Sequence, residues 1–435
     1  MKTGRRRKNL KQISNPVLGE TLFHRIHRSG LNVYILPKKG YSKSYAVFAT
    51  RYGSVDSKFI VPGEQEVTEV PDGIAHFLEH KLFEEEEGNV FEKFSRLGAS
   101  ANAFTSFNIT AYLFYCTDYF YENLDILLNF VQNPYFTDES VQKEQGIIGQ
   151  EIRMYEDDPH WRVYFNLLGA LYHCHPVRKD IAGTIESISK INKDILYKCY
   201  NTFYNPSNML LFIAGDVNPD EVWEHVEKCI KVCDRTKSGI KRIYPEEPEI
   251  INQPKVEQKL SVSIPLFQIG FKDNDIGYGG ERLLRKDIVT RILLEMVLGK
   301  STVLYQDLYE KGLINDTFES DFTAEIDYGF TILGGESSQP EKVQQYILEE
   351  IDRLRSRGLE KNEYERIKKV IYGRFIRQFN NIEGIANNFM ANLFKDIDLL
   401  NYIDVFETIT LDDVNERLVN HFKPENMALS VVRPY

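Results

Sequence analysis

The chain has 435 residues, 42% of them apolar and 27% charged, which is typical of a globular protein large enough for two domains. Its formal net charge of −11 argues against a protein that binds nucleic acid or an anionic membrane. No run approaches about 18 consecutive apolar residues, so we expect no transmembrane span.

Residues 1–20 form a basic N-terminal tail, with no acid before Glu20. No apolar region follows, so we expect a solvated tail rather than a secretory signal. Strands are predicted between Leu31 and Val55, where β-branched and aromatic residues alternate. Helices and strands follow through this half: a helix from about Gly73, a strand at 111–116, helices at 119–131, 138–156, 160–172 and 186–203, a strand at 208–217 and a helix at 219–233.

Residues 234–256 are the best linker in the chain, because they contain three prolines and little apolar periodicity. The pattern then restarts: a strand at 261–272, a helix at 281–298, a strand at 330–338, helices at 340–356, 360–378 and 410–420, and a last strand at 427–434. We therefore expect an α+β fold in two similar parts, an N-terminal domain at 21–233 and a C-terminal domain at 257–435.

The cysteines indicate a reducing compartment. Their odd number and irregular spacing form no disulfide framework, so we expect a cytoplasmic protein. Cys229 and Cys233 are one helical turn apart, but no second pair accompanies them, and we expect no zinc site there. The five cysteines are Cys116, Cys174, Cys199, Cys229 and Cys233.

The segment 71–83, PDGIAHFLEHKLF, carries the chemistry of the chain: His76, Glu79 and His80 form the pattern H-x-x-E-H on a predicted helix. Residues four apart lie one above the other on a helix, so both imidazoles can bind one Zn²⁺ at about 2.0–2.1 Å. Glu79 is placed to hold the attacking water rather than the metal. The alternative is a pair of ordinary core histidines, which the intervening Glu makes less favoured.

A catalytic zinc needs a third protein ligand and one open position. The predicted helix in 137–159 offers Glu144 and Glu151, seven residues apart and therefore on one face, and the spacing leaves both as candidates. His173 and His175 flank Cys174 in a second metal-like pattern, but a loop before Pro176 is the more ordinary interpretation.

The wider sequence resembles a known family. The segments concerned are GIAHFLEHKLF, GASANAFTSFNITAYLF, KEQGIIGQEI, DDPHWR, HPVRKDIAGTIESI and FYNPSNMLLFIAGDV. Together with the inverted zincin motif, they resemble the pitrilysin/insulinase family of zinc peptidases, and most closely its bacterial processing-peptidase-like members. The resemblance implies a subunit of two similar α+β domains that forms half of an enclosed chamber.

The resemblance also implies roles for single residues. His76 and His80 would bind one zinc per chain, Glu151 would be the third ligand, and Glu79 would be the general base. No zinc site is implied in the C-terminal domain.

Three further residues take roles by the same resemblance. Glu144 would orient a histidine ligand or the helix from outside the ligand set. Asn102 and Ala103 would lie on an edge strand along which the substrate backbone pairs.

One segment departs from the family pattern. The stretch 307–318 stands where some members carry an Arg and a Tyr that reach substrate carbonyls, but here Tyr309 and Asn315 occupy those positions. This implies a heterodimer in which a paralogous subunit supplies the Arg/Tyr pair, with a homodimer as the alternative.

We therefore predict a zinc-dependent endopeptidase that hydrolyses peptides or unfolded segments. The alternative is a non-catalytic subunit of a processing or assembly complex. The intact set of His76, Glu79, His80 and Glu151 argues against that alternative.

Overall fold

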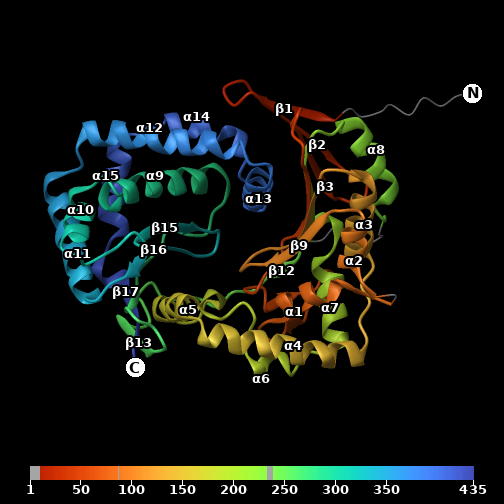
Figure 1. Cartoon of the computed structure of the whole chain (residues 1–435), viewed down its shortest axis with the longest axis horizontal. Coiled ribbons are helices and arrows are strands. Elements are labelled where there is room, and N and C mark those ends of the chain that lie inside the picture. Colours follow the sequence, from red (N-terminus) through yellow and green to blue (C-terminus); the bar gives the residue numbers. More distant parts are fainter. Residues whose placement is uncertain (1–9, 87, 233–238) are drawn as a thin grey trace, which may run out of the picture. The chain divides into compact units, whose positions relative to one another are not determined.

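The computed structural model describes residues 10–86, 88–232 and 239–435, and the chain folds into two compact units (Figure 1). The first unit comprises the described residues up to Gly146, together with Glu186–Ile243 and Gln378–Ala391. The second unit comprises Ile147–Ile185, Tyr244–Arg377 and Asn392–Tyr435.

The first unit is built on a seven-stranded sheet with the order β1-β2-β3-β11-β4-β10-β9. Its strands are β1 (Lys11–Asn15), β2 (Glu20–Ile26), β3 (Asn32–Pro37), β4 (Ser44–Thr50), β9 (Ser100–Thr105), β10 (Thr110–Cys116) and β11 (Met209–Gly215). β11 is fully buried and lies parallel to β3 and antiparallel to β4, which explains its unbroken apolar sequence. β9 pairs with β10 and ends the sheet.

Six main helices accompany this sheet: α1 (Ile74–Leu82), α2 (Val90–Arg96), α3 (Phe120–Gln132), α7 (Lys193–Phe203), α8 (Pro219–Cys229) and α13 (Ile382–Leu393). A small sheet joins β5 (Lys58–Ile60), β6 (Val67–Glu69) and β12 (Lys241–Arg242), and β7 (Glu84–Glu85) pairs with β8 (Gly88–Asn89). Although α13 comes late in the chain, Tyr45 on β4 donates a hydrogen bond to its Asn387 at 2.9 Å.

The second unit contains a five-stranded sheet with the order β13-β17-β14-β16-β15. These strands are β13 (Lys255–Lys259), β14 (Leu266–Lys272), β15 (Glu319–Ala324), β16 (Gly329–Glu336) and β17 (Met427–Arg433). In each of the two large sheets one pair is parallel, β3 with β11 and β13 with β17, and the remaining pairs are antiparallel. The order β3-β11-β4-β10-β9 therefore matches β13-β17-β14-β16-β15, which confirms the prediction of two α+β domains with one plan.

Helices of the second unit include α5 (Pro159–Leu171), α9 (Gly280–Leu298), α10 (Val303–Glu310), α11 (Pro340–Arg357), α12 (Lys361–Gln378), α14 (Tyr402–Glu407) and α15 (Leu411–His421). α5 packs against β14 and β17. A Cβ at Gly270 in β14 would lie 2.8 Å from Cδ1 of Leu171 on α5, so this glycine permits the close approach of helix and strand.

The two units divide the chain differently from the domains expected at 21–233 and 257–435. Residues 147–185 group with the second unit, because α5 buries its apolar side chains against that sheet, and 378–391 group with the first. The expected tail at 1–20 contains strand β1, while its residues 1–9 lie outside the described part. The expected linker at 234–256 includes β12 and the start of β13, and its residues 234–238 also lie outside the description.

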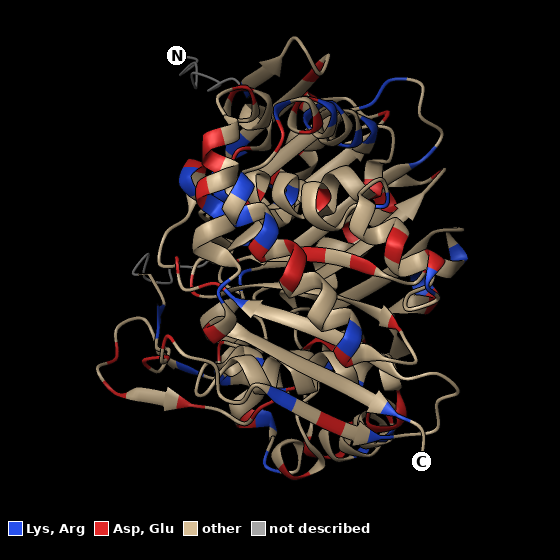
Figure 2. Ribbon diagram, turned by 90° about the vertical axis from the view of Figure 1, so that its left-hand side faces the viewer, with Lys and Arg blue, Asp and Glu red and all other residues tan. Residues whose placement is uncertain are grey.

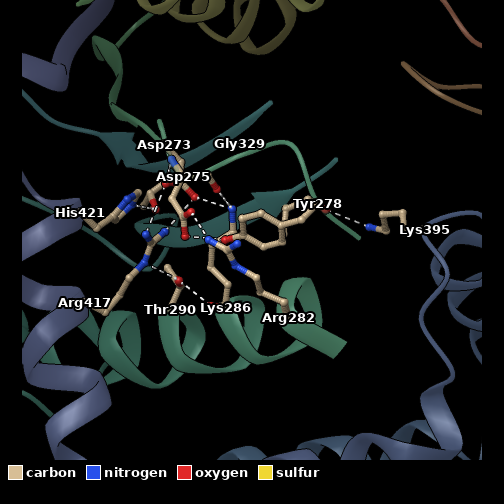
Figure 3. A network of polar contacts seen from close by, with 12 residues as sticks. Asp273, Asp275, Tyr278, Arg282, Lys286, Thr290, Gly329, Lys395, Arg417 and His421 are labelled. Carbon is tan, nitrogen blue, oxygen red and sulfur yellow. Dashed lines mark hydrogen bonds and ion pairs between the residues drawn. The ribbon is translucent and has the colours of Figure 1, made fainter. Parts of the chain in front are cut away.

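A charged network lies inside the second unit (Figure 3). Asp273, which directly follows β14, is 4% exposed and accepts from Arg417 at 2.9 and 3.3 Å and from Lys286 at 3.0 Å. Burial alone would raise the pKa of Asp273, but Arg417, His421 and Lys286 together outweigh it and hold the pKa well below its usual range. Elsewhere, residues of both charge signs are interspersed along the helices, as Figure 2 shows.

No helix in the described part of the chain is long and apolar enough to cross a membrane.

Candidate metal centre

Helix α1 holds two histidines at one turn of spacing. It begins after Gly73, whose φ of 89° lies in the left-handed region that glycine adopts without strain. Every residue of α1 except His80 is buried, so its ring of apolar side chains fixes the helix in the first unit. The rings of His76 and His80 lie 4.6 Å apart between centroids.

Helix α4 (Asp138–Asp157) carries the two candidate carboxylates. It begins in the first unit and continues as one helix beyond it, and Thr137 accepts from the backbone N–H of Ser140 at 3.1 Å to cap its start. Oε1 of Glu144 lies 3.0 Å from Nδ1 of His80. Glu151 lies two turns further along the same helix face.

His76, His80 and Glu151 offer ligand atoms that all lie within 4.8 Å of one another. Two imidazole nitrogens and one carboxylate oxygen are the donor set of a catalytic zinc with an open fourth position, so these side chains fit the ion that the sequence predicts. Glu144 is outside this set and contacts His80 instead.

Glu151 is held in place by a series of side-chain contacts. Tyr155, four residues later on α4, donates its hydroxyl to Oε1 of Glu151 at 2.6 Å. The ring of Tyr155 stacks on Trp161 with centroids 4.3 Å apart, and Trp161 donates to Asp180 at 2.6 Å. Burial raises the pKa of Asp180. The sequence analysis missed Tyr155, although its position one turn after Glu151 is a usable signal.

A buried lysine supports the other carboxylate. The Lys81 side chain is fully buried, with Nζ 4.0 Å from Oε2 of Glu144, and it also binds Glu84 and the carbonyl of Ser140. The positive charge lies beside Glu144, and Glu144 lies beside His80. This arrangement keeps the carboxylate oriented toward the histidine that it contacts.

Glu79 lies on the same helix between the two histidines and is 8% exposed. Thr105, on edge strand β9, donates its hydroxyl to Oε2 of Glu79 at 2.8 Å. Tyr112 and Tyr204 are buried nearby with their hydroxyls 2.8 Å apart, and burial raises the pKa of both, with Glu79 adding to the effect. The sequence analysis missed Thr105, because nothing in the local pattern links it to the helix.

The two residues expected on an edge strand do lie there. Asn102 is exposed and Ala103 is half-buried in β9, where they pair with Leu113 and Tyr112 of β10. The other side of β9 faces no strand of this sheet. The same strand therefore carries an open hydrogen-bonding edge and the threonine that contacts Glu79.

The segment at 307–318 begins in α10 and continues into the following loop. Tyr309 is 53% exposed, and Asn315 donates to Glu336 at 2.8 Å. Both residues belong to the second unit.

The second metal-like pattern forms a loop around a carboxylate. The backbone N–H groups of His173, Cys174 and His175 all donate to Glu247, at 2.7–2.8 Å, and Lys272 donates to the same carboxylate at 2.6 Å. These contacts agree with the loop that the sequence favours.

Two family descriptions match the sequence. Residues 63–185 match the family described as Insulinase (Peptidase family M16), and residues 190–371 match the Peptidase M16 inactive domain. His76, Glu79, His80 and Glu151 all lie within the first match.

Relatives cover nearly the whole chain. A Bacillus subtilis protein named Uncharacterized zinc protease YmfH is 47% identical over 98% of this chain and 99% of its own length. A second Bacillus subtilis protein, Uncharacterized zinc protease YmxG, is 28% identical over 86% of this chain and 92% of its own.

Solved structures match over a similar extent. A structure from Alicyclobacillus acidocaldarius described as M16-like aligns with a TM-score of 0.92 at 38% identity, over 96% of this chain and 99% of that one. A Helicobacter pylori protease aligns with a TM-score of 0.81 over 95% of this chain and 99% of that one, and its 20% identity shows a common fold.

Proposed function

The chain belongs to the insulinase family of peptidases, family M16, and from this premise we propose that it is a zinc-dependent endopeptidase. Its substrates would be peptides or unfolded segments. The observation that carries the proposal is the approach of His76, His80 and Glu151 to within 4.8 Å, with Glu79 buried on the same helix. Two histidines, a base and a distant carboxylate are the groups that an inverted zincin would use, which supports the proposal.

His76, His80 and Glu151 would hold one zinc ion per chain, which when bound supplies a Lewis acid and an acidified water at the open position. Glu79 accepts the proton of the attacking water and later passes it to the leaving amine. The Thr105 hydroxyl holds Oε2 of Glu79 and so limits rotation of the carboxylate.

The edge of β9 is proposed to bind the substrate backbone as an additional strand. Asn102 and Ala103 would supply the N–H and C=O groups of this pairing. Backbone pairing recognises an extended backbone and depends little on the substrate's side chains. This suits an enzyme that cleaves unfolded segments of varied sequence. Because Thr105 lies on the same strand, a substrate bound there would lie beside Glu79.

The match to the M16 inactive domain spans 190–371, which contains none of the proposed ligands. It is therefore compatible with a zinc site in the first half of the chain. The alternative function, a non-catalytic subunit, predicts no hydrolysis even when zinc is bound.

Replacing Glu79 by glutamine separates the two functions. Glu79→Gln keeps the side-chain shape and removes the proton acceptor, so peptide hydrolysis should fall at least about 10²-fold while the zinc content stays equal to that of wild type. Glu92→Gln, an exposed change on α2, is the matched control and should leave the rate unchanged. Equal turnover by wild type and Glu79→Gln would refute the assigned base, and no hydrolysis by zinc-loaded wild type would favour the alternative.

We propose further that the working enzyme is a heterodimer. The proposal rests on the family resemblance, which implies an Arg and a Tyr where this chain has Tyr309 and Asn315, and Asn315 donates to Glu336 at 2.8 Å. Loss of one such donor to a developing oxyanion typically costs about 2.7–4 kcal/mol. A paralogous subunit would supply the pair, and a homodimer would be weakly active.

The partner requirement is measurable with the purified chain. We expect low turnover of unstructured peptides by the chain alone and a large increase when the paralogous subunit is added. Full activity of the chain alone, unchanged by the second subunit, would contradict the heterodimer.

A cytoplasmic location is also proposed from the pattern of the cysteines. The four cysteines in the described part of the chain are free thiols.

A further inference from the structure

A second group of metal-ligating side chains lies on the first unit, on helices that the proposed peptidase chemistry does not use. His225 and Cys229 are four residues apart on α8, and Asp125 lies on the neighbouring helix α3. Their ligand atoms all lie within 4.8 Å of one another. The sequence pairs Cys229 with Cys233 and offers no complementary pair, whereas the fold brings Asp125, 104 positions earlier, to the Cys229 thiol.

The three side chains converge on one carboxylate oxygen. Oδ1 of Asp125 lies 2.7 Å from Nε2 of His225 and accepts from Sγ of Cys229 at 3.2 Å. A tetrahedral zinc site with bonds of about 2.0–2.3 Å has ligand–ligand edges of about 3.3–3.6 Å. The Cys229–Asp125 spacing of 3.2 Å is close to such an edge, whereas the His225–Asp125 spacing of 2.7 Å is shorter, so side-chain rotations that separate His225 from Asp125 would admit an ion between the three atoms.

The backbone around the cluster is fixed by several contacts. Gln132 of α3 donates to the carbonyl of Cys229 at 3.4 Å and accepts from the N–H of Lys231 at 2.8 Å, which ties the end of α8 to α3. The ring of Tyr121 lies 5.1 Å from that of His225. A site whose supporting backbone is already ordered loses little conformational entropy on binding.

The arrangement of Asp125, His225 and Cys229 suits three metal ligands better than a cysteine nucleophile activated by a base. A reactive cysteine needs a cationic neighbour or an imidazole at the sulfur, but here the carboxylate of Asp125 contacts both other groups. Burial, together with Asp125, raises the pKa of the Cys229 thiol to about 11. A raised pKa disfavours the nucleophilic thiolate form.

We propose that Asp125, His225 and Cys229 form a second binding site for zinc. One nitrogen, one sulfur and one oxygen ligand suit a borderline-soft divalent cation and disfavour Mg²⁺ or Ca²⁺, which prefer oxygen ligands alone. The fourth position is open to water, because Asp125 has 54% of its side chain exposed. The ion would clamp α3 to α8, and this inference is independent of the proposed peptidase activity.

The cobalt spectrum of the full chain tests the site without any assay of activity. The first site offers nitrogen and oxygen, so a thiolate-to-cobalt charge-transfer band in the near ultraviolet can arise only at a site with a cysteine. We expect the band in wild type and its loss in Cys229→Ser. Cys174→Ser, which removes an exposed thiol elsewhere, is the matched control and should keep the band. Absence of the band in wild type, or its persistence in Cys229→Ser, would overturn the proposal.

Zinc counting provides a second measurement that still applies if the cysteine variant fails to fold. Under chelator buffering, wild type should retain two zinc ions per chain and His225→Ala one. His80→Ala should also retain one, because it removes only the first site. Retention of two ions by His225→Ala would overturn the second site, whereas retention of two ions by His80→Ala would count against the first.

Discussion

Replacing Glu144 by glutamine should weaken zinc binding by about 10-fold without unfolding the chain. Glu144 is 5% exposed, with Oε1 3.0 Å from Nδ1 of His80 and Oε2 4.0 Å from Nζ of Lys81. Glutamine keeps an oxygen that accepts from Nδ1 of His80. Glutamine loses the negative charge that makes the His80 imidazole a stronger ligand. The lower zinc affinity of the variant therefore measures the contribution of that charge.

The size of the effect follows from these contacts. Partners that hold a metal-bound histidine are typically worth 10–100-fold in metal affinity, or about 1.4–2.7 kcal/mol. Glutamine retains the hydrogen bond, so Glu144→Gln should fall at the lower end of this range. Glu144→Ala removes both the charge and the acceptor and should approach about 100-fold. Lys81 keeps Glu84 as a partner in both variants, which limits the loss of stability.

Competition with a chromogenic zinc chelator measures these affinities. Glu139→Gln, an exposed change in the first turn of the same helix, is the control and should bind zinc like wild type. An affinity of Glu144→Gln within about twofold of wild type would refute the reasoning. If Glu151→Gln binds zinc normally while Glu144→Gln loses it, the two carboxylates have exchanged roles.

Four other changes test single contacts elsewhere in the chain. Thr105→Val removes the hydrogen bond to Glu79, so kcat should fall about 10-fold or more with zinc content unchanged. Asp273→Asn leaves the buried cations Arg417 and Lys286 without their carboxylate partner. The free energy of unfolding, measured by urea denaturation, should therefore fall by about 3–5 kcal/mol. Because the folded-state pKa of Asp273 is depressed, its contribution should be present above about pH 4 and decline as the pH falls further. Gly53→Ala should cost about 1–3 kcal/mol, because the new Cβ would lie 2.3 Å from a backbone carbonyl carbon. Gly373→Ala, in an exposed helix position with open space, should instead stabilise by up to about 1 kcal/mol, read from thermal melts.

Local patterns predicted much of the fold. Helical periodicity identified the helices that became α3, α4 and α9, and the apolar run of β11 indicated a central strand. The repeated order of elements predicted the repeated sheet. Local sequence could not assign α5 to the second unit or α13 to the first, because those assignments depend on which distant sheet each helix buries its apolar face against.

The residues of the candidate site also fall into two groups, those that local sequence predicts and those that only the folded structure reveals. The spacing of His76, Glu79 and His80 is a local property of one helix, so the sequence predicted these three directly. Thr105 and Tyr155 reach the site through contacts that only the folded chain creates. Asp125 likewise meets His225 and Cys229 across 100 and 104 residues of sequence, and no pattern in α3 marks it as a ligand.

Anomalous diffraction from crystals of the zinc-loaded chain, recorded above and below the zinc edge, tests the central assignment most directly. We expect a peak about 2.0–2.2 Å from one ring nitrogen of His76, from Nε2 of His80 and from a carboxylate oxygen of Glu151. A peak bound to Glu144 in place of Glu151, or no peak between these helices in crystals that contain zinc, would contradict it.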